Sequence, residues 1–95
     1  MSDMSDISTI WVFNAARSNF PGAVFSTLEA AEFWIKGHRL TGTLTRYPLD
    51  QGAYDWAVSR GYFQASMPEH RSPEFIGRFS AANQEHYHYE NGGRE

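Results

Sequence analysis

Residues 9–13 read TIWVF and do most to decide the fold. Each side chain is β-branched or aromatic, without polar alternation, which is typical of a strand covered on both faces. We therefore expect a central strand. Residues 14–22 contain Asn, Ser, Pro and Gly and predict a loop, and residues 23–25 are short enough to form the second arm of an antiparallel pair. The segment as a whole predicts a hairpin with a long loop.

A helix is predicted directly after this hairpin. Ser26 and Glu29 have the S-x-x-E spacing of a capping box, in which Ser26 caps a backbone N–H and Glu29 reaches back to the cap residue. We expect the helix to reach about Lys36, with Gly37 closing it in the left-handed conformation. Its inner stripe consists of Leu28, Ala31, Trp34 and Ile35.

A strand and a second helix are predicted next. Residues 42–47 alternate Thr43, Thr45 and Tyr47 with Leu44 and Arg46, the period of a strand with one solvated face, and Pro48 ends it. Asp50 is expected to cap a helix of roughly ten residues that ends at Gly61. This helix is expected to turn inward Tyr54, Ala57 and Val58.

The last third of the chain predicts another helix and a strand. Ser72, Pro73 and Glu74 form a helix start, because a cap residue is followed by proline at the first helical position and then by an acid. This helix is expected to bury Phe75, Ile76 and Phe79. Residues 85–90 read EHYHYE, and their strict alternation predicts the final strand.

These elements predict an α+β fold in the order β-β-α-β-α-α-β, with a mixed or antiparallel sheet of about four strands and three helices packed mainly on one side. Such a fold leaves the other sheet face or an edge strand free for a partner. Residues 1–8 are expected to be a disordered tail, residues 9–91 a single domain and residues 92–95 a frayed C-terminus.

Composition excludes several classes of protein. The 95 residues contain no cysteine, so disulfide frameworks, thiolate metal sites and cysteine nucleophiles are excluded, and a cytoplasmic location is expected. Residues 1–8 lack the basic and apolar regions of a signal peptide, and no segment predicts a membrane span. The net charge of −3 argues against nucleic acid and suits a basic partner.

His86 and His88 are the candidate metal ligands. On a strand, side chains two residues apart project from the same face, so both imidazoles lie within reach of one ion. A site needs a third ligand, for which His70, Glu69 and Glu90 are candidates. The alternative is a solvated surface strand, and no cofactor is expected.

Aromatic side chains supply the candidate partner contacts. Tyr87 and Tyr89 share the face opposite the histidines, where they either pack in the core or contact a partner. Trp56 and Phe33 point away from the inner stripes of their helices, and two rings so placed suggest exposed apolar surface. Asp55, beside Trp56, completes the candidate set.

The aromatic rings have an alternative interpretation, and the acidic residues do not indicate catalysis. The loop residues that would cover Trp56 and Phe33, leaving no exposed patch, are Phe20, Tyr62 and Phe63.

Asp50 and Asp55, five residues apart, lie on different helix faces and do not form a glycosidase-like pair. The chain also lacks a Gly-rich phosphate loop and the common hydrolase motifs, so no enzyme and no catalytic residue is expected.

The chain resembles an uncharacterised family of small bacterial proteins along residues 9–91. The resemblance supplies no activity or catalytic residue. The opening hairpin and the following helix also look locally like immunity proteins encoded beside toxins. The first resemblance is carried by Trp11-Val12-Phe13, Phe20-Pro21, Val24-Phe25-Ser26, Ala31-Glu32, Trp34-Ile35, Gly42-Thr43-Leu44-Thr45, Tyr47-Pro48-Leu49-Asp50, Tyr54-Asp55-Trp56-Ala57, Ser72-Pro73-Glu74-Phe75-Ile76 and Glu85-His86-Tyr87-His88-Tyr89.

The function expected from these observations is that of a non-enzymatic protein-binding module, monomeric or homodimeric. The most concrete form is a cytosolic immunity or antitoxin-like protein that covers the active site of a basic toxin. The alternative is a small-molecule or metal-binding domain that uses the strand face of His86 and His88.

Overall fold

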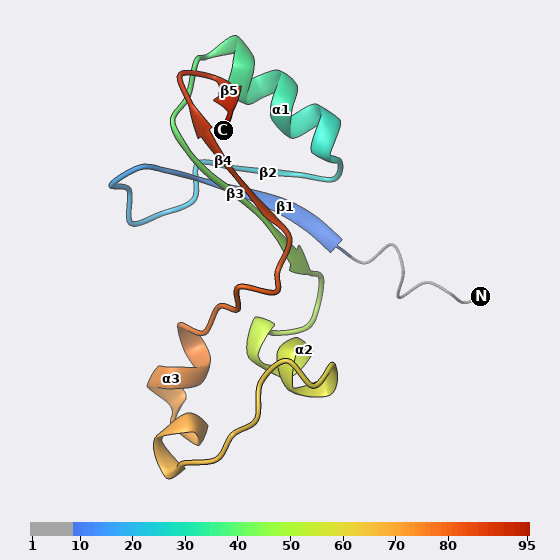
Figure 1. Ribbon diagram of the computed structural model, residues 1–95, viewed down its shortest axis with the longest axis vertical. Helices are drawn as coiled ribbons and strands as arrows, with labels where there is room; N and C mark the ends of the chain where they lie inside the picture. Colours follow the sequence, from blue (N-terminus) through green and yellow to red (C-terminus); the bar gives the residue numbers. More distant parts are fainter. Residues whose placement is uncertain (1–8) are drawn as a thin grey trace, which may run out of the picture.

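The computed structural model describes residues 9–95, which form a five-stranded antiparallel sheet, three α-helices and one short 3-10 helix (Figure 1). The strand order across the sheet is β2-β1-β3-β4-β5. This architecture confirms the α+β class and the predicted order of elements. The expected tail at residues 1–8 lies outside the described residues. The elements in chain order are β1 (Thr9–Ala15), β2 (Ala23–Phe25), α1 (Leu28–Gly37), β3 (Gly42–Pro48), α2 (Ala53–Ser59), η2 (Pro68–Arg71), α3 (Pro73–Gly77), β4 (His86–Glu90) and β5 (Gly93–Arg94).

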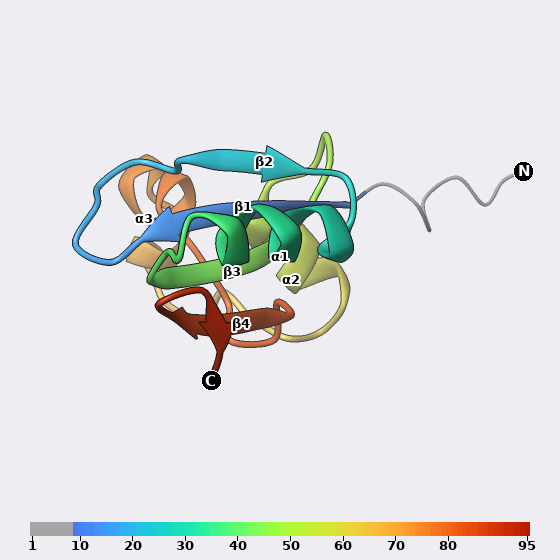
Figure 2. The same ribbon diagram turned by 90° about the horizontal axis from the view of Figure 1, so that it is seen from above.

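Two lobes make up the part of the chain that the structure describes. The sheet lobe comprises the five strands and α1, and the helical lobe comprises residues 49–83 with α2, η2 and α3. α1 lies on one side of the sheet and the helical lobe lies beyond its other side (Figures 1 and 2). The expectation that the helices pack mainly on one side is therefore wrong.

β1 is an interior strand, paired with β2 on one side and with β3 on the other. Trp11 and Phe13 are buried on the face that α1 covers, whereas Ile10 and Val12 on the opposite face are only partly buried. The prediction of a central position is confirmed. Burial on both faces is not observed, because α1 covers one face of β1 while Ile10 and Val12 on the other face stay partly exposed.

α1 begins one residue later than predicted. The hydroxyl of Thr27, not that of Ser26, accepts a hydrogen bond from the Ala30 N–H at 3.1 Å. The predicted inner stripe is confirmed, since Ala31 and Ile35 are buried. The left-handed residue that follows the helix is Arg39 (φ 55°) and not Gly37, which is still helical.

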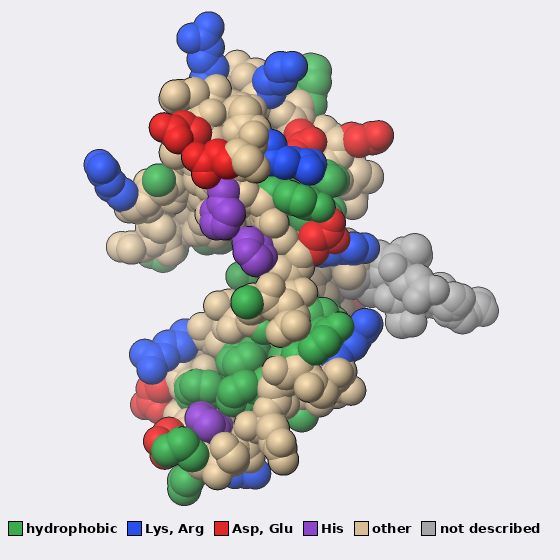
Figure 3. Space-filling model, viewed as in Figure 1, with side chains coloured by type: hydrophobic (Ala, Val, Ile, Leu, Met, Phe, Trp, Pro, Cys, Tyr) green, Lys and Arg blue, Asp and Glu red, His purple; other side chains and the backbone are tan. Residues whose placement is uncertain are grey.

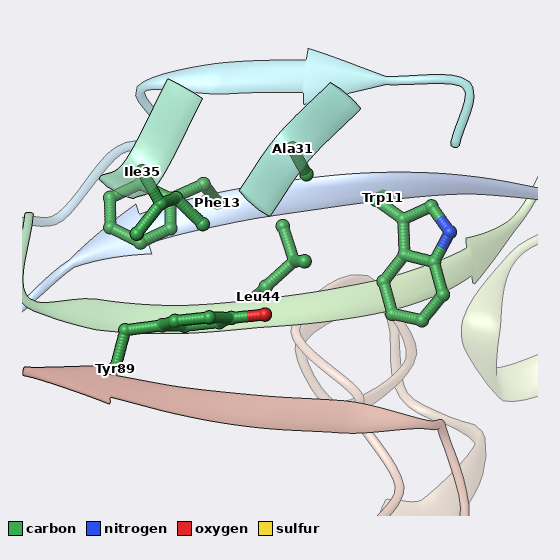
Figure 4. Close-up of a cluster of buried hydrophobic side chains, with 6 residues drawn as sticks. All are labelled: Trp11, Phe13, Ala31, Ile35, Leu44 and Tyr89. Atoms are coloured by element: carbon green, nitrogen blue, oxygen red, sulfur yellow. The ribbon is translucent and has the colours of Figure 1, made fainter. Parts of the chain in front are cut away.

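The core of the sheet lobe lies between α1 and the sheet (Figure 4). Gly42 of β3 makes this packing possible, because a Cβ there would lie 2.2 Å from the Asn14 carbonyl oxygen and 2.8 Å from the Phe13 ring. Any side chain at this position would force β1 and β3 apart. The buried core residues are Trp11, Phe13, Ala31, Ile35, Leu44 and Tyr89.

The caps of the helical lobe are partly as predicted. α2 begins after Gly52, and Asp50 does not cap it but takes a left-handed conformation (φ 62°) in the preceding turn. Ser72 caps α3 as predicted, since its hydroxyl accepts a hydrogen bond from the Phe75 N–H at 3.1 Å. Of the side chains predicted to point inward, Val58 and Ile76 are exposed instead, because no element covers that side of their short helices.

The C-terminus was expected to fray and instead forms β5. Arg94 pairs with Tyr89 in the sheet, and its guanidinium donates hydrogen bonds to the Glu32 carboxylate on α1. Sheet pairing and this ion pair hold the last residues, which explains the fifth strand. Within residues 9–95, no helix is long and apolar enough to cross a membrane.

Candidate interaction surface

Five rings of the helical lobe form what we call the aromatic cluster. Neighbouring ring centroids lie between 5.0 and 6.2 Å apart, in tilted and edge-to-face arrangements that aromatic side chains favour. The rings come from α2, from η2, from α3 and its C-terminal flank, and from the loop between α2 and η2. The members are Tyr54, Phe63, His70, Phe75 and Phe79.

Local hydrogen bonds position the cluster. The Nδ1 atom of His70 accepts hydrogen bonds from the backbone N–H groups of Ser66 and Met67 at 3.2 and 3.3 Å, which fixes the imidazole beside Phe63 and Phe75. Arg71 donates to the Ala65 carbonyl at 3.1 Å and holds the same loop. The loop therefore has an ordered path although it has no regular secondary structure.

The aromatic cluster is open to solvent. Ala57 is the one fully buried residue of the helical lobe, and every ring of the cluster is only partly buried. Figure 3 shows hydrophobic side chains gathered on the viewed face of this lobe. Exposed apolar surface of this kind commonly marks an interaction site. Further exposed apolar side chains of the lobe are Leu49, Val58, Tyr62, Met67 and Ile76.

Trp56 lies at the junction of the two lobes. It is only partly buried, in keeping with its predicted position off the inner stripe, and Tyr62 partly covers it at a ring distance of 5.4 Å. The Arg60 guanidinium lies 5.6 Å from the indole centroid. Trp56 lines a cavity of about 300 Å³ between α2 and the sheet lobe. Tyr62 thus covers the ring in part, as the alternative interpretation supposed.

The sheet-lobe wall of this cavity is formed by an ion pair. Arg46 contacts Glu85 at 3.0 Å, donates to the Thr9 hydroxyl at 3.1 Å and lies over the Trp11 ring at 5.7 Å. The hydrogen bond from the Tyr87 hydroxyl, together with Arg46, lowers the pKa of Glu85 below its ordinary value against the opposing effect of partial burial. Glu85 is therefore held in its charged form.

Tyr89 packs in the core and is not available to a partner, which is the first of the two alternatives considered for Tyr87 and Tyr89. It is 3% exposed in the core and its hydroxyl donates to Glu32 at 2.6 Å. Burial and this hydrogen bond raise the pKa of Tyr89. Its partner on the same face, Tyr87, is partly buried against Trp11 at 5.9 Å, with the Arg94 guanidinium 4.0 Å from its ring. Alternation predicted the shared face, but not that α1 covers it.

His86 and His88 are exposed on the sheet face away from α1, with ring centroids 5.4 Å apart. Their Nδ1 atoms lie 2.7 Å from the Gln84 carbonyl and 3.3 Å from the Thr43 hydroxyl, respectively. Within residues 9–95, no group of three potential ligands is assembled, and His70 is held in the aromatic cluster instead. The structure thus brings no third ligand to the histidine pair.

The remaining candidates are Phe33 and Asp55. Phe33 is 83% exposed on the outer side of α1, as its helical phase predicted, and Asp55 is exposed on α2. Phe20 does not cover Phe33, since it is itself 77% exposed. The sequence interpretation missed the aromatic cluster as a unit, although Phe75 and Phe79, one helical turn apart, were a signal of it.

The structure defines a class of small α+β protein in which an antiparallel sheet with one covering helix carries a second, aromatic helical lobe. The chain belongs to the family described as Domain of unknown function (DUF7710), whose model matches residues 10–95. The expectation of an uncharacterised family is confirmed, and no finding supports the likeness to toxin-immunity proteins. Comparison with curated proteins and with solved structures gives no match.

Proposed function

We propose that this chain is a non-enzymatic protein-binding module whose partner covers the aromatic cluster of the helical lobe. The observation that carries the proposal is the openness of the cluster, in which five rings contact one another while none is fully buried. Aromatic side chains supply much of the binding energy at protein interfaces, and partly exposed rings have solvent-accessible area left to bury.

The contact is expected to be mainly apolar. The net charge of −3 includes Asp3 and Asp6, whereas residues 9–95 carry nine acidic and eight basic side chains, a net charge of −1. Charge therefore adds little support for a specifically basic partner. A partner with an apolar groove or with exposed aromatic side chains fits the aromatic cluster better.

Affinity capture from cytosolic extract of the source organism tests the proposal, since we also propose a cytosolic location on the absence of cysteine. The double variant Met67→Ser, Ile76→Ser removes two exposed apolar side chains beside His70 and Phe75. We expect the wild-type chain to capture one stoichiometric protein and the double variant to bind it at least about 2 kcal/mol more weakly, the size of an interface hot spot.

Val24→Ser is the matched control, because Val24 is exposed and apolar but lies on β2 of the sheet lobe. Phe33→Ser tests the α1 surface separately. Equal binding by the wild-type chain and the helical-lobe variant, or loss of binding with Phe33→Ser alone, would contradict the proposed site. Capture of a toxin with a masked active site would support the narrower immunity function, and capture of a second copy would identify a homodimer.

A further inference from the structure

A cavity at the junction of the two lobes is separate from the aromatic cluster and has its own chemistry. It has a volume of about 300 Å³, which is at the lower end of small-molecule sites. Its walls combine one aromatic ring, two guanidinium groups, one carboxylate and neutral polar side chains. The lining residues are Thr9, Arg46, Trp56, Arg60, Asn83, Gln84 and Glu85.

The charges of this cavity do not cancel. Arg46 is neutralised by Glu85, at 3.0 Å. Arg60 has no ion-pair partner among residues 9–95 and lies over Trp56 at the C-terminal end of α2. One positive charge, that of Arg60, therefore remains. Its guanidinium group is planar and presents several N–H donors in a fork-shaped arrangement.

The neutral polar side chains Gln84 and Asn83 of the cavity differ in their hydrogen bonding. Gln84 is 2% exposed, and its side chain accepts a hydrogen bond from the Ala81 N–H at 2.9 Å and donates one to the Arg46 carbonyl at 3.1 Å. Each polar atom of this side chain is therefore hydrogen-bonded within the protein, and Gln84 forms a fixed wall. Asn83 is exposed at the rim, where its amide can donate to a ligand.

We propose that this cavity binds a small planar organic anion, with its carboxylate or phosphate group on Arg60 and its ring against Trp56. Guanidinium groups bind both anions through paired hydrogen bonds, and an indole face offers the flat apolar surface that a ring requires. The site is independent of the proposed protein partner, because none of its lining residues belongs to the aromatic cluster.

Titration followed by ¹H–¹⁵N NMR of the full chain tests this inference. The probes are benzoate, phenyl phosphate, inorganic phosphate and the uncharged benzamide, and Trp56→Phe assigns the indole signal of Trp56. We expect saturable shifts of that signal with benzoate or phenyl phosphate, and the better of the two identifies the anionic group. Benzamide and inorganic phosphate, which lack either the charge or the ring, are expected to bind at least about tenfold more weakly.

Arg60→Gln is expected to weaken binding of the better probe about tenfold or more, which is the effect of losing one charge-assisted hydrogen bond. Arg60→Lys keeps the charge and is expected to lose less affinity. Arg78→Gln is the matched control, because Arg78 is an exposed arginine of the helical lobe outside the cavity. No saturable shift with either planar anion, equal shifts with benzamide, or equal losses in Arg60→Gln and Arg78→Gln would overturn the proposal.

Discussion

The two lobes differ in how much of their apolar surface they bury. The sheet lobe has six buried hydrophobic side chains between α1 and the strands, whereas the helical lobe buries Ala57 alone. Aromatic residues are present in both. The difference teaches that aromatic residues alone are not enough to form a hydrophobic core, because a core also needs a helix or strand that covers the rings.

Element length explains this difference. In the sheet lobe, the ten-residue α1 presents a continuous stripe to strands that hydrogen-bond to one another. The elements of the helical lobe have seven, four and five residues, too few for stable helices without tertiary packing. We infer that the sheet lobe provides most of the free energy of unfolding and that the helical lobe opens at lower cost.

The largest expected effect contrasts Phe13→Ala with Phe75→Ala. Phe13 is fully buried in the sheet lobe, so its loss is expected to cost about 3–5 kcal/mol of the free energy of unfolding. Phe75 is only partly buried in the aromatic cluster, and about half that cost or less is expected. Urea denaturation measures both. Equal losses would mean that the helical lobe is as well packed as the sheet lobe.

A smaller contrast separates one tryptophan of each lobe, Trp34 and Trp56. Trp34 packs on Phe13 and Phe25 at ring distances of 5.8 and 5.5 Å, whereas Trp56 contacts Tyr62 and Arg60 at the lobe junction. Trp34→Ala is therefore expected to cost about 2 kcal/mol or more and Trp56→Ala about 1 kcal/mol. Thermal and urea denaturation compare them. A larger loss for Trp56→Ala would make its ring a main support of the fold.

The smallest effect concerns the ion pair that holds β5 to α1. Partial burial acts to raise the pKa of Glu32, but hydrogen bonds from Tyr89 and Arg94 outweigh it and lower the pKa below its ordinary value of 4.5. Because the folded-state pKa is the lower one, this contribution is present above pH 4.5 and is lost as the pH falls through the folded-state pKa.

Glu32→Gln is expected to reduce the free energy of unfolding at neutral pH by up to about 1 kcal/mol, the range of partly exposed ion pairs. The difference in free energy of unfolding between wild type and Glu32→Gln should shrink when denaturation is measured at pH values below the ordinary pKa of Glu32. The helical lobe has no part in this pair, so Glu74→Gln on α3 is the control. A difference that stays constant with falling pH would argue against a charged contact.

Periodicity predicted most of the sheet lobe. The inner stripe of α1 and the alternation of β4 follow directly from side-chain spacing, and the Ser72-Pro73 start of α3 follows from its cap chemistry. The cap of α1 lies one residue later than predicted because Ser26 and Thr27 are adjacent and both residue types can cap a helix. Spacing alone does not choose between them.

The rest depended on contacts between distant residues. β5 has the composition of a tail, and its pairing relies on Arg94 reaching Glu32, 62 positions earlier in the chain. Burial of Tyr89 required knowing which sheet face α1 covers. Phe63 and His70 lie in and beside an irregular loop, where no period exists to bring them together. Residue spacing therefore pairs Phe75 with Phe79 but does not predict the whole aromatic cluster.

The helical lobe leaves the sheet after β3 and returns at β4, and these two strands are direct antiparallel neighbours with Thr45 opposite His86. The Arg46 N–H donates to the Glu85 carbonyl at 2.9 Å, so the two ends of the lobe meet. In terms of topology, the whole lobe is one long hairpin connection between β3 and β4. The closure entropy of such a connection grows by only about 0.6 kcal/mol for each doubling of its length. A change in the length of this segment is therefore expected to cost little closure entropy while every strand register of the sheet is kept.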